Sequence, residues 1–179
     1  KKKKTIVSNE SADIIRMLNG SFRSFGDSAV DLCPSEHLEE IDSVNALVYG
    51  SINNGVYKAG FATSQVAYEE AVTSLFDTLD VLERRMEGKS YLVGGVLTEA
   101  DIRLFTTLVR FEPVYFGHFK CNLRPLSSYP NLLRLVRRIY ALPGIAGTCR
   151  LDEMKQHYYG SHPTVNPSGV IPVGPAQWP

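Results

Sequence analysis

One stretch of fifteen residues, LTEADIRLFTTLVRF at positions 97–111, constrains the fold of this chain more than any other feature. Thr98 lies three residues before Asp101, so a hydroxyl and a carboxylate can each satisfy a backbone N–H at a helix start. The residues that follow are apolar at helical spacing and carry few charges. Because a helix that is apolar on nearly all sides is usually buried all round, the sequence predicts a buried helix with Thr98 and Asp101 as its structural capping box.

Apolar residues continue at helical spacing through most of the chain. Helices are expected over residues 10–19, 38–52, 64–88, 98–112 and 131–141, and in short pieces up to residue 159. The Asn53-Asn54-Gly55 triplet is expected to end the second of these, followed by an irregular connection over residues 56–61. Residues 115–126 are expected to form a loop, and Thr5-Ile6-Val7 is a short strand candidate. The chain is therefore expected to be all-α, apart from a hint of a strand at its start.

Charge and cysteine content exclude several classes of function. Basic and acidic residues number 19 each, so no basic surplus favours nucleic acid or an anionic membrane, and no membrane span is expected. Cys33, Cys121 and Cys149 are scattered, which argues against a disulfide framework and fits a reducing compartment, here predicted to be the cytoplasm. Neither the cysteines nor the histidines have the spacing of a metal site, so no metal is expected.

Three long motifs follow one another in this sequence. They are NNGVYKAGFA at residues 53–62, TEADIRLFTTLVRFEPVYFGHFKCN at residues 98–122 and KQHYYGSHPTVNPSGVIPVGP at residues 155–175. Together they resemble the glutathionyl-hydroquinone reductases, the Xi class of glutathione transferases. The resemblance extends from Thr5 to Pro175, almost the whole chain.

The resemblance implies a division of the chain. Residues 1–20 would be a remnant of a thioredoxin-like α/β domain, made of its last strand and last helix, and residues 21–34 a linker. Residues 35–179 would be the all-helical C-terminal bundle of a glutathione transferase. Its proline- and glycine-rich tail, residues 163–179, would wrap back over the domain.

The Cys-Pro-Trp-Ala motif that carries the nucleophile of this family is absent from the sequence. Cys33-Pro34 imitates it without the tryptophan and lies in the expected linker. We therefore expect a fragment that lacks the catalytic cysteine and is inactive by itself.

The activity implied is the reduction of glutathionyl-hydroquinones to hydroquinones, with glutathione as co-substrate. A low-pKa thiolate supplied by other residues would attack the conjugate sulfur. This chain would supply the hydroquinone-binding and dimerisation domain of a homodimer that acts on aromatic glutathione conjugates. The alternative is a noncatalytic transferase-like helical module that serves protein assembly or binds aromatic ligands.

Glu10 and Ser11 match the acidic-serine pair of the family's glutathione site. The N–H groups and positive dipole end at a helix start suit a carboxylate such as that of the γ-glutamyl group. Glu10 could accept a hydrogen bond from the ammonium of the same group. The alternative is that the pair merely caps its own helix.

By the same resemblance, Tyr57 and Tyr158 are expected to line the hydroquinone pocket. A phenol ring can stack on the substrate ring while its hydroxyl bonds a substrate oxygen. The roles of Tyr115 and Tyr159 are left open. The other tyrosines are expected to be packing residues, namely Tyr49, Tyr68, Tyr91, Tyr129 and Tyr140.

Overall fold

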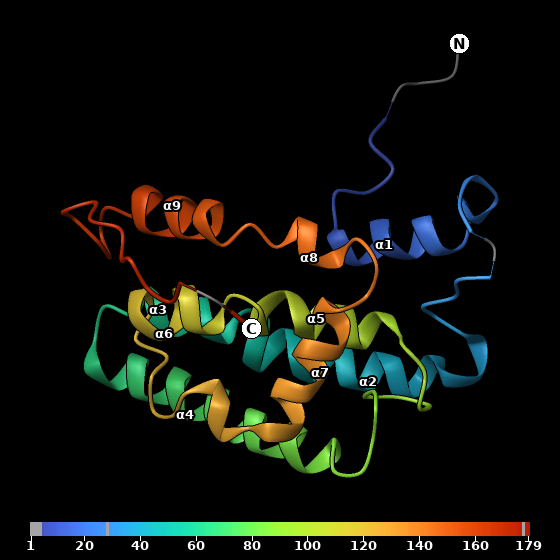
Figure 1. Cartoon of the computed structure of the whole chain (residues 1–179), viewed down its shortest axis with the longest axis horizontal. Helices are drawn as coiled ribbons and strands as arrows, with labels where there is room; N and C mark the ends of the chain where they lie inside the picture. Colours follow the sequence, from blue (N-terminus) through green and yellow to red (C-terminus); the bar gives the residue numbers. More distant parts are fainter. Residues whose placement is uncertain (1–4, 28, 177) are drawn as a thin grey trace.

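A computed structural model describes residues 5–27, 29–176 and 178–179 and shows a helical protein with no strand among those residues. The helical segments in chain order are α1 (Ser11–Asn19), η1 (Arg23–Phe25), η2 (Ser35–His37), α2 (Leu38–Val48), η3 (Tyr49–Asn53), α3 (Gly55–Gly60), α4 (Gln65–Arg85), α5 (Glu99–Leu108), η4 (Phe111–Tyr115), α6 (Phe116–His118), η5 (Leu126–Ser128), α7 (Pro130–Tyr140), α8 (Ile145–Thr148) and α9 (Leu151–Ser161). Figure 1 shows α5 in the middle of the molecule, α4 and α7 below it, and α1, α8 and α9 along the upper edge.

Helix α5 forms the centre of the core, as the capping box and its apolar run predict. Thr98 and Asp101 are both fully buried. The Asp101 carboxylate accepts hydrogen bonds from Thr98 N at 2.9 Å, from the Thr98 hydroxyl at 3.1 Å and from Leu92 N at 2.8 Å. The capping box is therefore confirmed, and it joins the start of α5 to the loop that precedes it.

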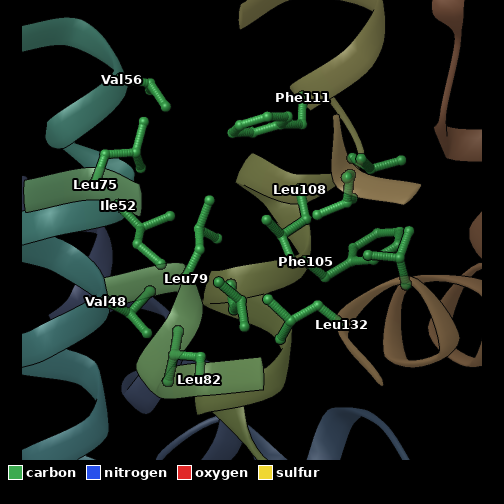
Figure 2. Close-up of a cluster of buried hydrophobic side chains, with 14 of the residues drawn as sticks. Val48, Ile52, Val56, Leu75, Leu79, Leu82, Phe105, Leu108, Phe111 and Leu132 are labelled. Carbon is green, nitrogen blue, oxygen red and sulfur yellow. The ribbon is translucent and has the colours of Figure 1, made fainter. Parts of the chain in front are cut away.

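Helices α2, α4 and α7 surround α5 with apolar side chains that fill the core shown in Figure 2. Of the apolar stripe expected on α4, Leu75, Leu79 and Leu82 are completely buried, whereas the first half is not: Tyr68 and Ala71 are half-buried and Ala67 is exposed. In Figure 2, Leu75 lies near Val56 of α3, Leu79 lies between Ile52 of η3 and Leu108 of α5, and Leu82 lies near Val48 of α2. Burying a leucine side chain contributes about 1.5–3 kcal/mol, so this core accounts for much of the stability of the bundle.

One expected connection is helical, and the loop expected over residues 115–126 is helical only at its ends, with residues 119–125 non-helical as expected. Residues 56–61 lie in or at the end of α3, because Asn54 adopts right-handed helical angles and does not end the preceding helix. The residues that were expected to form a loop after Tyr115 begin with α6. Close packing explains both corrections, since the Phe119 ring lies so near Gly60 that a Cβ at Gly60 would be 2.2 Å from it.

The strand expected at Thr5-Ile6-Val7 is not formed. A strand requires a neighbouring strand to pair its backbone groups, and none exists among the described residues. Ile6 is 84% exposed and Val7 is 88% exposed. The following helix α1, by contrast, forms almost as expected.

Helix α1 and the C-terminal tail each make polar contacts with the bundle. On α1, the Arg16 guanidinium forms a 2.6 Å ion pair with the buried Glu99 at the start of α5. In the tail, Val173 O accepts a hydrogen bond from Lys155 Nζ at 2.9 Å. Trp178 Nε1 donates to Val109 O at 2.9 Å. The tail thus returns to the body of the molecule as expected, and the C-terminus lies near α5 in Figure 1. No helix in the described ranges is long and apolar enough to cross a membrane.

Candidate functional site: a cavity of converging phenols

Three tyrosines from three different segments meet at one point. The hydroxyls of Tyr57, on α3, and Tyr158, on α9, are 2.6 Å apart. The hydroxyl of Tyr115, at the end of η4, is 2.9 Å from that of Tyr158. Tyr115 is 2% exposed and Tyr158 is 7% exposed, whereas Tyr57 remains 36% exposed. The structure therefore brings the two predicted tyrosines together and adds Tyr115, whose role was open.

The three phenols line a cavity of about 400 Å³ that is open to the surface. The rest of its lining consists of Ser11, Tyr49, Asn53, Asn54, Arg103, Thr106, Thr107 and Arg110. Ser11, expected at a glutathione site, thus shares a cavity with the residues expected at the hydroquinone site. Its neighbour Glu10 is exposed and does not line the cavity. Tyr49, expected to be a packing residue, lines the cavity instead and is 52% exposed.

Burial keeps Tyr115 and Tyr158 protonated. It raises the pKa of Tyr115 far above the ordinary value and that of Tyr158 to about 12. The hydrogen bond with Tyr115 lowers the pKa of Tyr158 and raises that of Tyr115. Tyr158 is therefore easier to ionise than Tyr115, and at neutral pH both are neutral groups that can donate a hydrogen bond to a ligand oxygen.

The start of α1 lacks the cap that the alternative interpretation of Glu10 and Ser11 requires. Glu10 occupies the N-cap position in an extended conformation, and its side chain forms no capping hydrogen bond. The hydroxyl of Ser8 accepts from Glu10 N at 3.1 Å and donates to Asp13 at 2.7 Å. The Glu10 side chain thus does not cap its own helix, while its role toward glutathione stays a prediction.

Tyr159 and the histidines form a second aromatic cluster behind the cavity. Tyr159 packs its ring 4.5 Å from that of His118 and does not line the phenol cavity. His118 Nε2 lies 3.1 Å from His162 Nδ1. In residues 5–27, 29–176 and 178–179, no group of three or more His, Cys, Asp or Glu side chains is arranged to hold a metal ion. The expectation of no metal stays a prediction.

Sequence reasoning missed the polar face of α5 in this cavity. Arg103, Thr106 and Thr107 are spaced three and four residues apart, so they lie on one side of an otherwise buried helix, and Arg110 follows just after that helix ends. The spacing of these polar residues can be seen in the sequence alone. Asn53 donates to Arg103 O at 3.0 Å and to the Thr107 hydroxyl at 2.6 Å, which attaches η3 to this face. Both η3 and η4 are π-helical, a form often found at functional sites.

Comparison with known proteins identifies the relatives of this fold. Residues 65–138 match the family described as "Glutathione S-transferase, C-terminal domain". The chain is 57% identical over 177 residues to the glutathionyl-hydroquinone reductase PcpF of Sphingobium chlorophenolicum, covering 99% of this chain and 56% of that protein. It is 54% identical to the glutathionyl-hydroquinone reductase YqjG of Escherichia coli, covering 99% of this chain and 54% of that protein.

Solved structures agree with the sequence matches. The glutathione-bound structure of Escherichia coli YqjG superposes with a TM-score of 0.92 at 54% identity, covering 97% of this chain and 56% of the other. The glutathione S-transferase Xi of Phanerochaete chrysosporium gives a TM-score of 0.92 at 51% identity, covering 96% of this chain and 56% of the other. The chain thus spans somewhat more than half the length of the relatives it matches, and the resemblance found in its motifs is confirmed.

Proposed function

Because the chain belongs to the Xi-class glutathione transferases, the class of the glutathionyl-hydroquinone reductases, we propose that its phenol cavity holds the ring of a glutathionyl-hydroquinone during glutathione-dependent reduction. The observation that carries this proposal is the 2.6 Å contact between the hydroxyls of Tyr57 and Tyr158, which converge from α3 and α9. Neutral phenols at this point can donate to the oxygens of a dihydroxylated ring.

In the proposed reaction, the thiolate, the phenols and the start of α1 each have a different task. A thiolate attacks the conjugate sulfur, an S–S bond forms, and the C–S bond to the ring breaks. The electron pair passes to the ring carbon, which takes up a proton, and a second glutathione resolves the mixed disulfide. Phenol donors near the ring oxygens would stabilise the charge that develops there. Ser11 and the start of α1 would bind the γ-glutamyl carboxylate, and Glu10 its ammonium.

None of the three cysteines in the sequence suits the thiolate step. Burial raises the pKa of Cys121 to about 12. Burial and the nearby Glu99 carboxylate also raise the pKa of Cys33. Cys149 does not line the phenol cavity. We therefore propose that these 179 residues bind the conjugate but do not reduce it without a Cys-Pro-Trp-Ala segment.

The division of the chain belongs to the same proposal. Residues 1–20 would be part of a thioredoxin-like domain, residues 21–34 a linker and residues 35–179 the helical domain. A homodimer and a cytoplasmic location are further parts of it, the latter based on the scattered cysteines. The alternative, a noncatalytic helical module for protein assembly or aromatic-ligand binding, is not favoured, since the relatives matched at 57% and 54% identity are reductases.

Ligand binding tests the proposal directly. We expect the chain to bind S-glutathionyl-hydroquinone, measured by isothermal titration calorimetry. Tyr57→Phe and Tyr158→Phe should each weaken binding by about three- to tenfold, because each removes a hydrogen bond worth about 1 kcal/mol. Tyr140→Phe, on α7 outside the cavity, is the matched control and should leave binding unchanged. Equal dissociation constants for all four proteins would contradict the proposal.

A further inference from the structure

Arg103 and Arg110 stand apart from the other half-buried arginines. Among the described residues, the arginines of intermediate exposure are Arg16, Arg23, Arg85, Arg103 and Arg110. The first three each form an ion pair with a carboxylate. Within the described ranges, no carboxylate lies within 4.0 Å of the guanidinium of Arg103 or Arg110. Two half-buried positive charges therefore lie at this place without a carboxylate within ion-pair distance among the described residues.

Both arginines lie in the wall of the phenol cavity. Arg103 lies on α5 and Arg110 lies two residues after α5 ends, in the turn that leads into η4. The lining contains two arginines and neither aspartate nor glutamate, so the cavity carries a positive charge. The electrostatic influence of Arg110 reaches the phenol cluster, where it lowers the pKa of Tyr158.

The contacts that the two guanidinium groups do make leave donors available. Arg110 Nη1 donates to Thr106 O at 2.5 Å. The Arg103 guanidinium lies 5.8 Å from the centre of the Tyr49 ring. A guanidinium has five N–H donors in a planar fork that matches a carboxylate. These contacts hold the arginines at the cavity while most of their donors stay free for a ligand.

We propose that Arg103 and Arg110 make the cavity selective for aromatic rings that carry an anionic substituent, with a ring carboxylate as the preferred group. This inference rests on the proposed function, since it concerns the ring that the phenols hold. It names the substrate class as acidic dihydroxylated aromatics rather than neutral hydroquinones. A carboxylate could also come from glutathione itself. Both arginines line the same cavity as the three phenols, which favours the ring, and Ser11 at the start of α1 offers glutathione a contact of its own.

The test compares three ligands on the same chain. Calorimetry measures the binding of hydroquinone, of 2,5-dihydroxybenzoate, which is the same ring with a carboxylate, and of glutathione. We expect the carboxylated ring to bind about tenfold more tightly than hydroquinone at low salt. This preference should weaken as ionic strength rises, because salt screens charges that are open to solvent.

Substitutions test whether the two arginines cause the preference for the carboxylated ring. Arg103→Gln and Arg110→Gln should each reduce the preference, and the double variant should bring the ratio of the two dissociation constants to about one. Arg137→Gln, exposed on α7, removes one positive charge outside the cavity and is the matched control.

Each outcome decides the inference. Equal binding of the two rings, a preference that survives the double substitution, or an arginine dependence confined to glutathione would each overturn it. If the preference is absent but Tyr57→Phe weakens binding of the glutathionyl conjugate, the inference fails while the proposed function stands. If neither ring nor the conjugate binds, both fail together.

Discussion

At the scale of single residues, Asp101 shows how a buried charge is retained. Burial raises the pKa of this carboxyl group, while its hydrogen bonds from Leu92 N and from Thr98 lower it. The same bonds satisfy donors that are themselves buried. A buried N–H without a partner costs about 1–3 kcal/mol. Removal of the carboxylate should therefore destabilise the fold mainly by leaving these N–H groups without an acceptor.

This reasoning gives a stability prediction. Asp101→Ala should lower the free energy of unfolding by about 3 kcal/mol or more, because it leaves two buried N–H groups without an acceptor. Asp101→Asn keeps one acceptor oxygen and should cost less. Urea denaturation monitored by circular dichroism measures both. Asp152→Ala, exposed in the first turn of α9, serves as the control and should change stability by under about 0.5 kcal/mol. A cost for Asp101→Ala no larger than that of the control would refute the argument.

At the scale of helices, periodicity predicts the long elements and fails for the short ones. The stripe of Leu75, Leu79 and Leu82 identifies α4, because a long helix must bury one face. Helix α3 could not be predicted in this way, since Asn54 and Gly55 usually end a helix. Tertiary contacts decide there, including the close packing of the Phe119 ring on Gly60.

The residues of the candidate site likewise differ in whether the sequence could predict them. Tyr57 and Tyr158 are 101 residues apart, so no local spacing could pair them, and only the resemblance to a family did so. Arg103 on α5 and Arg110 just after it line the same cavity, and their seven-residue spacing is visible in the sequence. What the sequence could not provide was the knowledge that these residues share a cavity with the phenols, because that depends on how α3, α5 and α9 pack.

The junction between α6 and the end of α9 predicts a pH dependence. His118 is 5% exposed, and its pKa is lowered to about 4, first by burial and then by the charges of His162 and Lys120. Burial and His157 also lower the pKa of His162. The unfolded chain therefore binds more protons than the folded chain between pH 6.5 and about 4. Stability should accordingly fall as pH falls through this window.

Comparison with a variant isolates this effect from the titration of carboxylates. The original chain should lose about 1–2 kcal/mol more than His118→Asn between pH 6.5 and 4, as the pKa shift of one well-buried histidine allows. Urea denaturation at several pH values measures the difference. His37→Asn, in η2 away from this cluster, should follow the original chain. Parallel pH profiles for His118→Asn and the original chain would exclude the proposed dependence.

At the scale of the whole molecule, the cavity exists because distant parts of the chain are held against α5. Ser11 lies on α1, and Arg16 of the same helix forms an ion pair with Glu99 of α5. Tyr158 lies on α9, and α9 is linked to the tail by the hydrogen bond from Lys155 Nζ to Val173 O. Site and stability are thus coupled, because contacts that hold the two ends of the chain also hold residues of the cavity.

Removal of the tail tests this coupling. Lys155 is 6% exposed, and its ammonium donates to Val173 O. A chain without residues 163–179 should lose about 2–4 kcal/mol of stability, since a buried charge loses its acceptor and the packing of Trp178 is lost. Lys155→Met in the shortened chain should restore part of this loss, whereas the same substitution in the full chain should not stabilise it. Denaturation of the four proteins gives the coupling free energy, and a coupling near zero would show that α9 keeps its place without the tail.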